Sequence, residues 1–223
     1  MKSPILITVF AFLSYSLMGQ ASFTKGVLTY KVTEVDAEDY RLNMLNGLEV
    51  DIHFTPQRQL TTMSALFGMV SQKVLIQKME QTVDLFSSMM GRNYHVQFTP
   101  EDQQKKEDVK SSIQYFPKET KQIAGYTTYK AIVTNTKGDK VRTYELYITE
   151  DLVLDVEVMR DVDGLEDLKG LPLQYTINNP KLKLTFSATA VQQKIDLSVF
   201  DFDQTGYETI SPKEMKEKKI FGF

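Results

Sequence analysis

Alternation of hydrophobic and polar side chains predicts the clearest strands of this chain. Residues 181–190 place Leu, Leu, Phe, Ala and Ala between Lys, Lys, Thr, Ser and Thr, and residues 48–55 alternate in the same way. Successive side chains of a strand point to opposite faces of its sheet. Both segments are therefore expected to be strands with one buried and one hydrated face.

The stretch from Lys121 to Asp151 predicts a β-hairpin. Residues 126–134 and 140–149 are rich in β-branched and aromatic residues, and the turn-forming residues 135–139 separate them. In the second run Tyr144, Leu146 and Ile148 share one face, and the other face is expected to be hydrated.

Other strands are predicted less sharply, at residues 22–35, 57–66, 93–98, 113–116, 152–159, 171–177 and 192–200. Thr99-Pro100 and Ser211-Pro212 are typical helix starts and predict a short helix after each. The pattern as a whole predicts a mainly β fold, a single large and strongly curved antiparallel sheet with one or two short helices.

The segment from Phe67 to Gly91 supports two interpretations. It contains no Pro, and five of its apolar residues have nearly helical spacing: Leu75, Met79, Val83, Phe86 and Met90. The alternative is a pair of strands, residues 73–78 and 82–90, joined by a turn at residues 79–81. Periodicity alone does not decide between them.

The first 21 residues have the pattern of an export signal. Lys2 precedes an apolar run at residues 5–17, and Gly19-Gln20-Ala21 has the small residues of a cleavage site. The run is shorter than the ~20 residues of a membrane-spanning helix, although an uncleaved anchor is the alternative. We expect residues 1–21 to be a cleaved signal peptide and residues 22–223 a single β-rich domain. The mature protein is expected to be periplasmic or secreted, without a transmembrane segment.

Charge and cysteine content exclude several classes of function. The chain has no cysteine, and therefore no disulfide framework, thiolate nucleophile or lipid-modified cysteine. Loss of Lys2 with the signal leaves 25 of 26 positive charges against 29 negative ones, so the formal net charge changes from −3 to −4. Nucleic acid is not an expected partner, because phosphate binding needs a concentrated basic patch.

No pattern of catalytic or metal-ligating residues emerges. Two histidines, His53 and His95, without cysteine do not make a zinc site. The sequence from Asp201 to Gly206 partly matches a calcium loop, but Pro212 occupies the place of the bidentate glutamate, which favours an aspartate-rich turn. The chain lacks a nucleophile elbow, a P-loop and a dinucleotide fingerprint. We expect no enzyme activity, no metal and no cofactor.

Several motifs resemble an uncharacterised family of exported bacterial proteins. They are residues 118–126 (KETKQIAGY), Tyr129-Lys130-Ala131 and residues 144–150 (YELYITE), with further counterparts at residues 83–91, 170–173 and 200–207. That family is similar to lipoprotein carriers of the LolA type. The resemblance implies a LolA-like half-barrel, an unclosed β-barrel around an apolar cavity lidded by helices, and it favours strands from Phe67 to Gly91. It transfers no established activity.

The apolar face of such a half-barrel predicts a non-enzymatic protein that binds a hydrophobic ligand, a lipid or acyl chain, in its hollow. The segment from Phe67 to Gly91 is the expected source of an apolar lid. The alternative is a cell-envelope interaction or structural module with a solid core, which would meet a partner protein through an edge strand or the acidic loop at residues 161–169. The expected cavity-lining residues are Leu146, Ile148, Leu182, Leu184, Phe186, Met63 and Phe67.

Overall fold

The computed structural model describes residues 21–65, 68, 70–89, 91–102, 109–138, 140–154, 165, 167–179 and 181–217. The expected signal peptide, apart from Ala21, lies outside the described residues. So do Phe67, residues 155–159 of an expected strand, and most of the helix expected after Pro100. In the part of the chain that is described, no helix is long and apolar enough to cross a bilayer.

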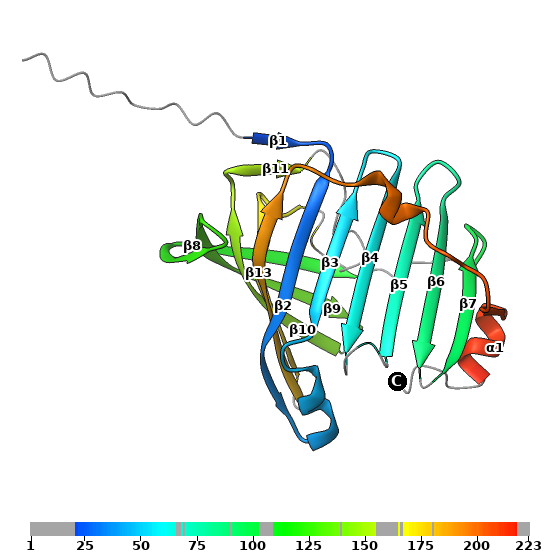
Figure 1. Cartoon of the computed structure of the whole chain (residues 1–223). Helices are drawn as coiled ribbons and strands as arrows, with labels where there is room; N and C mark the ends of the chain where they lie inside the picture. Colours follow the sequence, from blue (N-terminus) through cyan, green and yellow to red (C-terminus); the bar gives the residue numbers. More distant parts are fainter. Residues whose placement is uncertain are drawn as a thin grey trace, which may run out of the picture.

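Within the described residues, twelve strands form one sheet in the order β14-β7-β6-β5-β4-β3-β2-β13-β12-β10-β9-β8 (Figure 1). The chain first builds β2 to β7 as consecutive antiparallel neighbours, then continues at the far edge with β8 and returns until β13 pairs with β2. The bounds of these strands are β2 (Gly26–Ala37), β3 (Glu49–Phe54), β4 (Arg58–Ala65), β5 (Val70–Gln77), β6 (Thr82–Met89), β7 (Arg92–Phe98), β8 (Lys110–Ile123), β9 (Tyr126–Lys137), β10 (Lys140–Thr149), β12 (Leu171–Asn179), β13 (Leu182–Gln192) and β14 (Glu208–Thr209).

The sheet is strongly curved. Figure 1 shows β3 to β7 side by side as one wall, with β8, β9 and β10 running across behind it. A second, parallel pair, β1 (Ala21–Phe23) with β11 (Leu152–Leu154), lies at the end of the sheet where β2 begins. Phe23 and Leu152 are buried there in the main core. The predicted fold class, an open, curved and mainly antiparallel sheet, is confirmed.

The strand register defines two faces of the sheet. Directly paired residues have side chains on the same face, and one continuous row runs Leu28–Ile52–Thr61–Val74–Leu85–Val96 across β2 to β7. We call the face that carries this row the inner face, because it is turned toward β8, β9 and β10. The outer face carries His53, Leu60, Leu75, Phe86 and His95.

A C-terminal strap, residues 193–211, crosses the outer face of β4 to β7 (Figure 1). It begins with the 3-10 helix η3 (Leu197–Phe200), whose first turn is capped because the Asp196 carboxylate accepts a hydrogen bond from the backbone N–H of Ser198. Phe200 packs on Leu60 and Leu75, and β14 then pairs in parallel with the edge strand β7.

After the strap, the helix α1 (Pro212–Glu217) starts as the sequence predicts. Ser211 and Glu214 form a reciprocal capping box, in which Glu214 N donates to Ser211 Oγ and Ser211 N donates to the Glu214 carboxylate. Ile210 and Met215 pack against Val96 on the inner face, so the chain passes around the edge of β7.

Several predicted boundaries were wrong. Residues 193–200 form the strap and η3 instead of a strand, and the strand expected at residues 22–35 is interrupted at Thr24 and Lys25. The hairpin strands β9 and β10 extend into the expected linker, and the 3-10 helix η1 (Tyr40–Leu45) lies between β2 and β3. From Phe67 to Gly91 the strand interpretation is confirmed, because β5 and β6 form a hairpin.

Candidate functional site

The candidate site is the inner face, which is apolar across most of the sheet. Its centre is a cluster contributed by β2, β3, β12 and β13, in which Leu28, Tyr30 and Phe54 are at most 1% exposed. A smaller cluster on β9 and β10 contains Ala131, Val133, Leu146 and Ile148.

Tyr175 of β12 joins the two clusters. It packs against both, stacks on Phe186 with ring centroids 4.6 Å apart, and meets Tyr30 edge-on at 5.9 Å. Burial raises the pKa of its hydroxyl, as expected for a phenol removed from water. The inner face is therefore one continuous apolar surface from β3 to β9.

The structure brings six of the seven predicted cavity residues onto this face. The ladder Leu146–Tyr175–Phe186 places β10, β12 and β13 in one row, and Ile148, Leu182 and Leu184 lie on the same face. Met63 of β4 is paired with Val50 and shares the inner face. The seventh, Phe67, lies outside the described residues.

Burial differs among these six residues. Leu146 and Ile148 are 1% and 0% exposed, so they contact other side chains and not open space. Leu184 and Phe186 are buried as well, whereas Leu182 and Met63 are half-buried at the border of the main cluster. The expectation of one hydrated face on β10 was wrong at its end, because Tyr147 and Thr149 are also buried.

A covering segment that the sequence did not predict lies over the β9–β10 cluster. Leu165 and Leu168, between β11 and β12, pack against it, and Tyr115 accepts a hydrogen bond from the backbone N–H of Lys169. The expected lid, Phe67 to Gly91, supplies strands of the sheet instead. Leu165 and Leu168 stand three residues apart in an otherwise acidic loop. This spacing is the sequence feature from which the covering segment could have been predicted.

The inner face of the wall formed by β4, β5 and β6 is less completely buried than the two clusters. Val74, Ile76 and Val83 project from its inner face, are half-buried, and belong to none of the hydrophobic clusters formed by the described residues. Apolar side chains that stay partly exposed on a concave surface are typical of ligand sites. The sequence did not predict these three residues, because apolar residues occur on both faces of β5 and β6.

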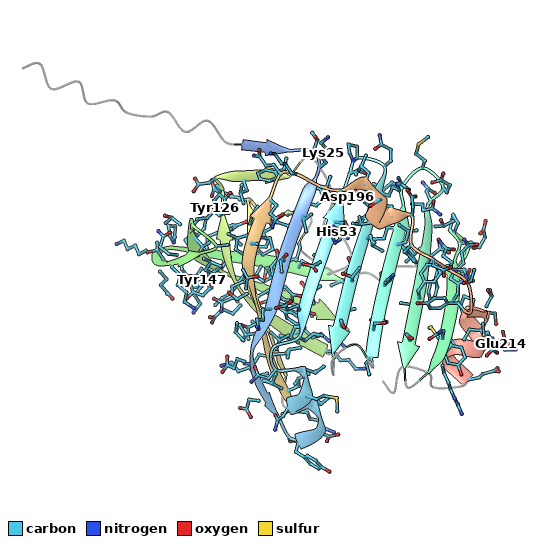
Figure 2. All side chains as sticks on the ribbon, viewed as in Figure 1. Lys25, His53, Tyr126, Tyr147, Asp196 and Glu214 are labelled. Carbon is cyan, nitrogen blue, oxygen red and sulfur yellow. The ribbon has the colours of Figure 1, made fainter. Side chains whose placement is uncertain are left out.

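The outer face of the central strands is polar. Glu34 pairs with Lys183 at 2.7 Å, which lowers the pKa of the Glu34 carboxyl, and Lys130 pairs with Glu145 at 3.1 Å. Tyr147, labelled in Figure 2, is covered there by Lys121, whose Nζ lies 3.8 Å from the ring centroid. Charges concentrated on this face keep it hydrated.

The two histidines do not meet. Both lie on the outer face, with β4, β5 and β6 between them, which separates them by four strand spacings or roughly 19 Å. His95 Nε2 is 2.8 Å from Asp84 and its ring stacks on Phe86, while burial lowers the pKa of His53. Among the described residues, no group of three or more acidic or histidine side chains could hold a metal ion.

The aspartate-rich sequence near residue 203 is a turn in the structure. The Asp203 carboxylate accepts hydrogen bonds from Thr205 N at 2.8 Å and Thr205 Oγ1 at 3.0 Å, and the backbone N–H lowers its pKa. Asp201 lies 3.8 Å from Arg58. These carboxylates have local partners.

A groove of about 500 Å³ lies on the outer face, between η1 and the strands β3 and β4. Its carboxylates are already engaged, since Asp51 accepts a hydrogen bond from Thr29 at 2.6 Å and Glu49 lies 3.7 Å from Lys31. The groove is therefore a weaker candidate than the inner face.

Tyr30 ties the inner face together and supports a prediction on stability. Its hydroxyl donates a 2.7 Å hydrogen bond to the backbone carbonyl of Pro172, and burial raises its pKa above the ordinary value of about 10. We expect Tyr30→Phe to lower the free energy of unfolding by about 1 kcal/mol at pH 7, because a buried carbonyl loses its partner.

Alkaline titration gives a second measurement on the same residue. The neutral phenol is favoured in the folded state, so its contribution is present below pH 10 and is lost as the pH rises further. Urea unfolding at several pH values should show a smaller alkaline loss of stability in Tyr30→Phe than in the wild type. Equal losses in both proteins would contradict this assignment, since Tyr175 is present in each.

Comparisons with known proteins do not assign this chain to a family. No family model matches the chain, and no curated protein matches it in sequence. An uncharacterised conserved protein from Thermus thermophilus has a similar structure, with 10% identity, a TM-score of 0.48, and coverage of 84% of this chain and 90% of that chain. The lipoprotein LppX of Mycobacterium tuberculosis has 11% identity, a TM-score of 0.42, and coverage of 78% and 90%.

Both TM-scores are below 0.5. The fold class therefore rests on the strand order.

Proposed function

We propose that this chain is an exported, non-enzymatic protein, with residues 22–223 folded as one domain, that binds a lipid or acyl chain on the inner face of its half-barrel. The observation that carries the proposal is the partly exposed apolar surface of β4 to β6, with Val74, Ile76 and Val83. A solid core would bury such side chains, since each apolar Å² left in water forgoes about 25 cal/mol.

The surface has the dimensions of a site for an extended chain. β4, β5 and β6 lie side by side, so the partly exposed wall is about 10 Å wide at the usual strand spacing. Thr61, Gln72 and Ser87 are distributed among the apolar residues of this wall. A few polar groups on a mainly apolar concave surface orient a ligand without requiring a specific partner for its tail.

A tryptophan reporter tests the proposal directly, because the chain contains no tryptophan. Thr61 and Thr62 are adjacent on β4, both half-buried, and they point to the inner and the outer face respectively. A brominated fatty acid should quench the emission of Thr61→Trp strongly and that of Thr62→Trp weakly. Quenching needs close approach of bromine to the indole, so the pair reports which face the chain occupies.

Two results would count against the proposal. Quenching of Thr62→Trp alone would move the ligand to the outer groove, which Thr62 lines. Absence of quenching in both variants, together with a protein that yields no lipid on extraction after purification from the exported fraction, would favour the solid-core interpretation.

A further inference from the structure

Charged side chains are divided unequally between the two faces of the sheet. The outer face carries both signs, including Glu34, Asp84, Lys130, Glu145 and Lys183. On the inner face, the charged residues at paired strand positions whose side chains the structure describes are Arg92, Lys140 and Arg142, with Glu208 on the two-residue edge strand β14. The inner face is therefore apolar and cationic, apart from that edge.

The register establishes the position of each cation. Arg92 pairs with Met89 and alternates with Tyr94 and Val96 on β7. Arg142 pairs with Asn135 and alternates with Tyr144 and Leu146 on β10. Residues two apart on a strand share a face, so both arginines project from the inner face.

The three cations lie at the same end of their strands, which we call the cationic end, although β7 and β10 are eight strand pairings apart. β7 and β10 run in the same direction, since each is separated from β2 by an odd number of antiparallel pairings, and both strands begin at this end. Glu150, which follows β10 at the opposite end, contacts the Tyr129 hydroxyl. The acidic and basic groups near the inner face are thus at opposite ends of β10.

These cations are available for a ligand. Arg92, Lys140 and Arg142 are exposed, and none of them has an ion-pair partner among the described residues. Glu217 of α1 lies 3.9 Å from Lys213, and Glu214 caps its own helix. An unpaired arginine favours a carboxylate, because the two groups form parallel N–H···O bonds.

The inner wall carries apolar residues from the cationic end onward, since the row of Arg92 also contains Val70 and Ala65. The row next to Arg92 contains Tyr94, Ser87, Gln72 and Met63, and the next contains Val96, Leu85, Val74 and Thr61. From Arg92 to Phe98 the strand rises about 20 Å. The hydrocarbon core of a bilayer is about 30 Å thick, so one membrane acyl chain spans about 15 Å. The length of the wall is therefore sufficient for such a chain with its polar head beside Arg92.

We infer that the ligand is a long-chain fatty acid, with its tail along Val74, Ile76 and Val83 and its carboxylate at the cationic end. This inference rests on the proposed function and adds the chemical class and orientation of the ligand. A neutral lipid would leave the cations without a partner, whereas a carboxylate provides the complementary charge next to the apolar rows.

Titration calorimetry with hexadecanoate and hexadecanol, which differ only in the head group, tests the inference. We expect hexadecanoate to bind about tenfold more tightly, and the double variant Arg92→Gln/Arg142→Gln to lose about that factor for hexadecanoate and none for hexadecanol. Higher salt should weaken only the hexadecanoate complex. Both arginines are exposed, and urea unfolding will verify that the variant is as stable as the wild type.

Lys110→Gln is the matched control. Lys110 is exposed and lies near the cationic end, opposite Thr136, but on the outer face, so its replacement should leave both affinities unchanged. Equal affinities of the wild type for the acid and the alcohol, with no effect of the double variant, would overturn the carboxylate assignment and leave the proposed function intact. Failure of both compounds to bind would overturn the proposed function itself.

Discussion

Replacing Phe86 with alanine is expected to lower the free energy of unfolding by about 3–5 kcal/mol, the usual cost of removing a buried aromatic ring. Phe86 is 2% exposed and lies where the strap meets the sheet. Its ring stacks on His95 at 4.4 Å and meets Phe202 at 5.0 Å and Tyr207 at 5.3 Å, both edge-on. The substitution leaves a cavity and removes the contact surface of the strap.

Urea unfolding measures the loss, and limited proteolysis reports whether the strap detaches before the sheet unfolds. Phe116→Ala is the control, since Phe116 is a half-buried outer-face residue of β8 at which the strap does not pack, and about 1 kcal/mol or less is expected there. A loss below about 1 kcal/mol in Phe86→Ala, with residues 193–211 still protected, would mean that other contacts hold the strap.

Gly26→Ala is expected to cost about 1–3 kcal/mol through overpacking. A Cβ at this position would lie 2.3 Å from the carbonyl oxygen of Gln192 and 3.3 Å from the ring of Phe54. Gly26 is at the start of β2, and β2 and β13 join the two halves of the sheet. Because the closest atom belongs to the backbone, β13 would have to move away from β2.

Gly125→Ala separates this steric effect from a conformational one. Gly125 has a φ of 86° and open space where a Cβ would be, so its substitution costs only about 1–2 kcal/mol of backbone strain. Denaturant unfolding of both variants, with amide exchange in β13, distinguishes the two causes. Unchanged exchange in β13 of Gly26→Ala would indicate that the strands accommodate the methyl group without separating.

Much of the strand content follows from local pattern. The alternation at residues 181–190 and 48–55 identifies β13 and β3, because each has a covered face and a polar face. The capping box at Ser211 identifies the start of α1 for a similarly local reason. These features depend on neighbours in sequence.

Prediction was weakest where both faces of a strand carry apolar residues. Leu75 and Phe86 are buried under the strap on the outer face, while Val74 and Val83 project from the inner face. The two-residue period is then lost, and nearly helical spacing remains. The strand predicted at residues 192–200 was wrong for a related reason, since its apolar residues pack on β4 and β5 as a covering segment.

For the candidate site, local pattern placed Leu146, Ile148, Leu182, Leu184 and Phe186 on one face, but not their degree of burial. Burial depends on which distant segment covers each part of that face. Leu165 and Leu168 cover the β9–β10 cluster, and Val74, Ile76 and Val83 remain partly exposed. The grouping of Arg92, Lys140 and Arg142 at one end likewise follows from the strand order.

By itself, the sequence determined that this chain forms strands with an apolar face, because side-chain direction alternates residue by residue within one strand. Only the tertiary structure decided which strands are neighbours, which part of the apolar face is covered, and where the cations lie along it. Those properties arise from pairing between strands as distant in the chain as β2 and β13, where Thr33 and Thr185 are 152 residues apart, and no local pattern encodes a contact of that range.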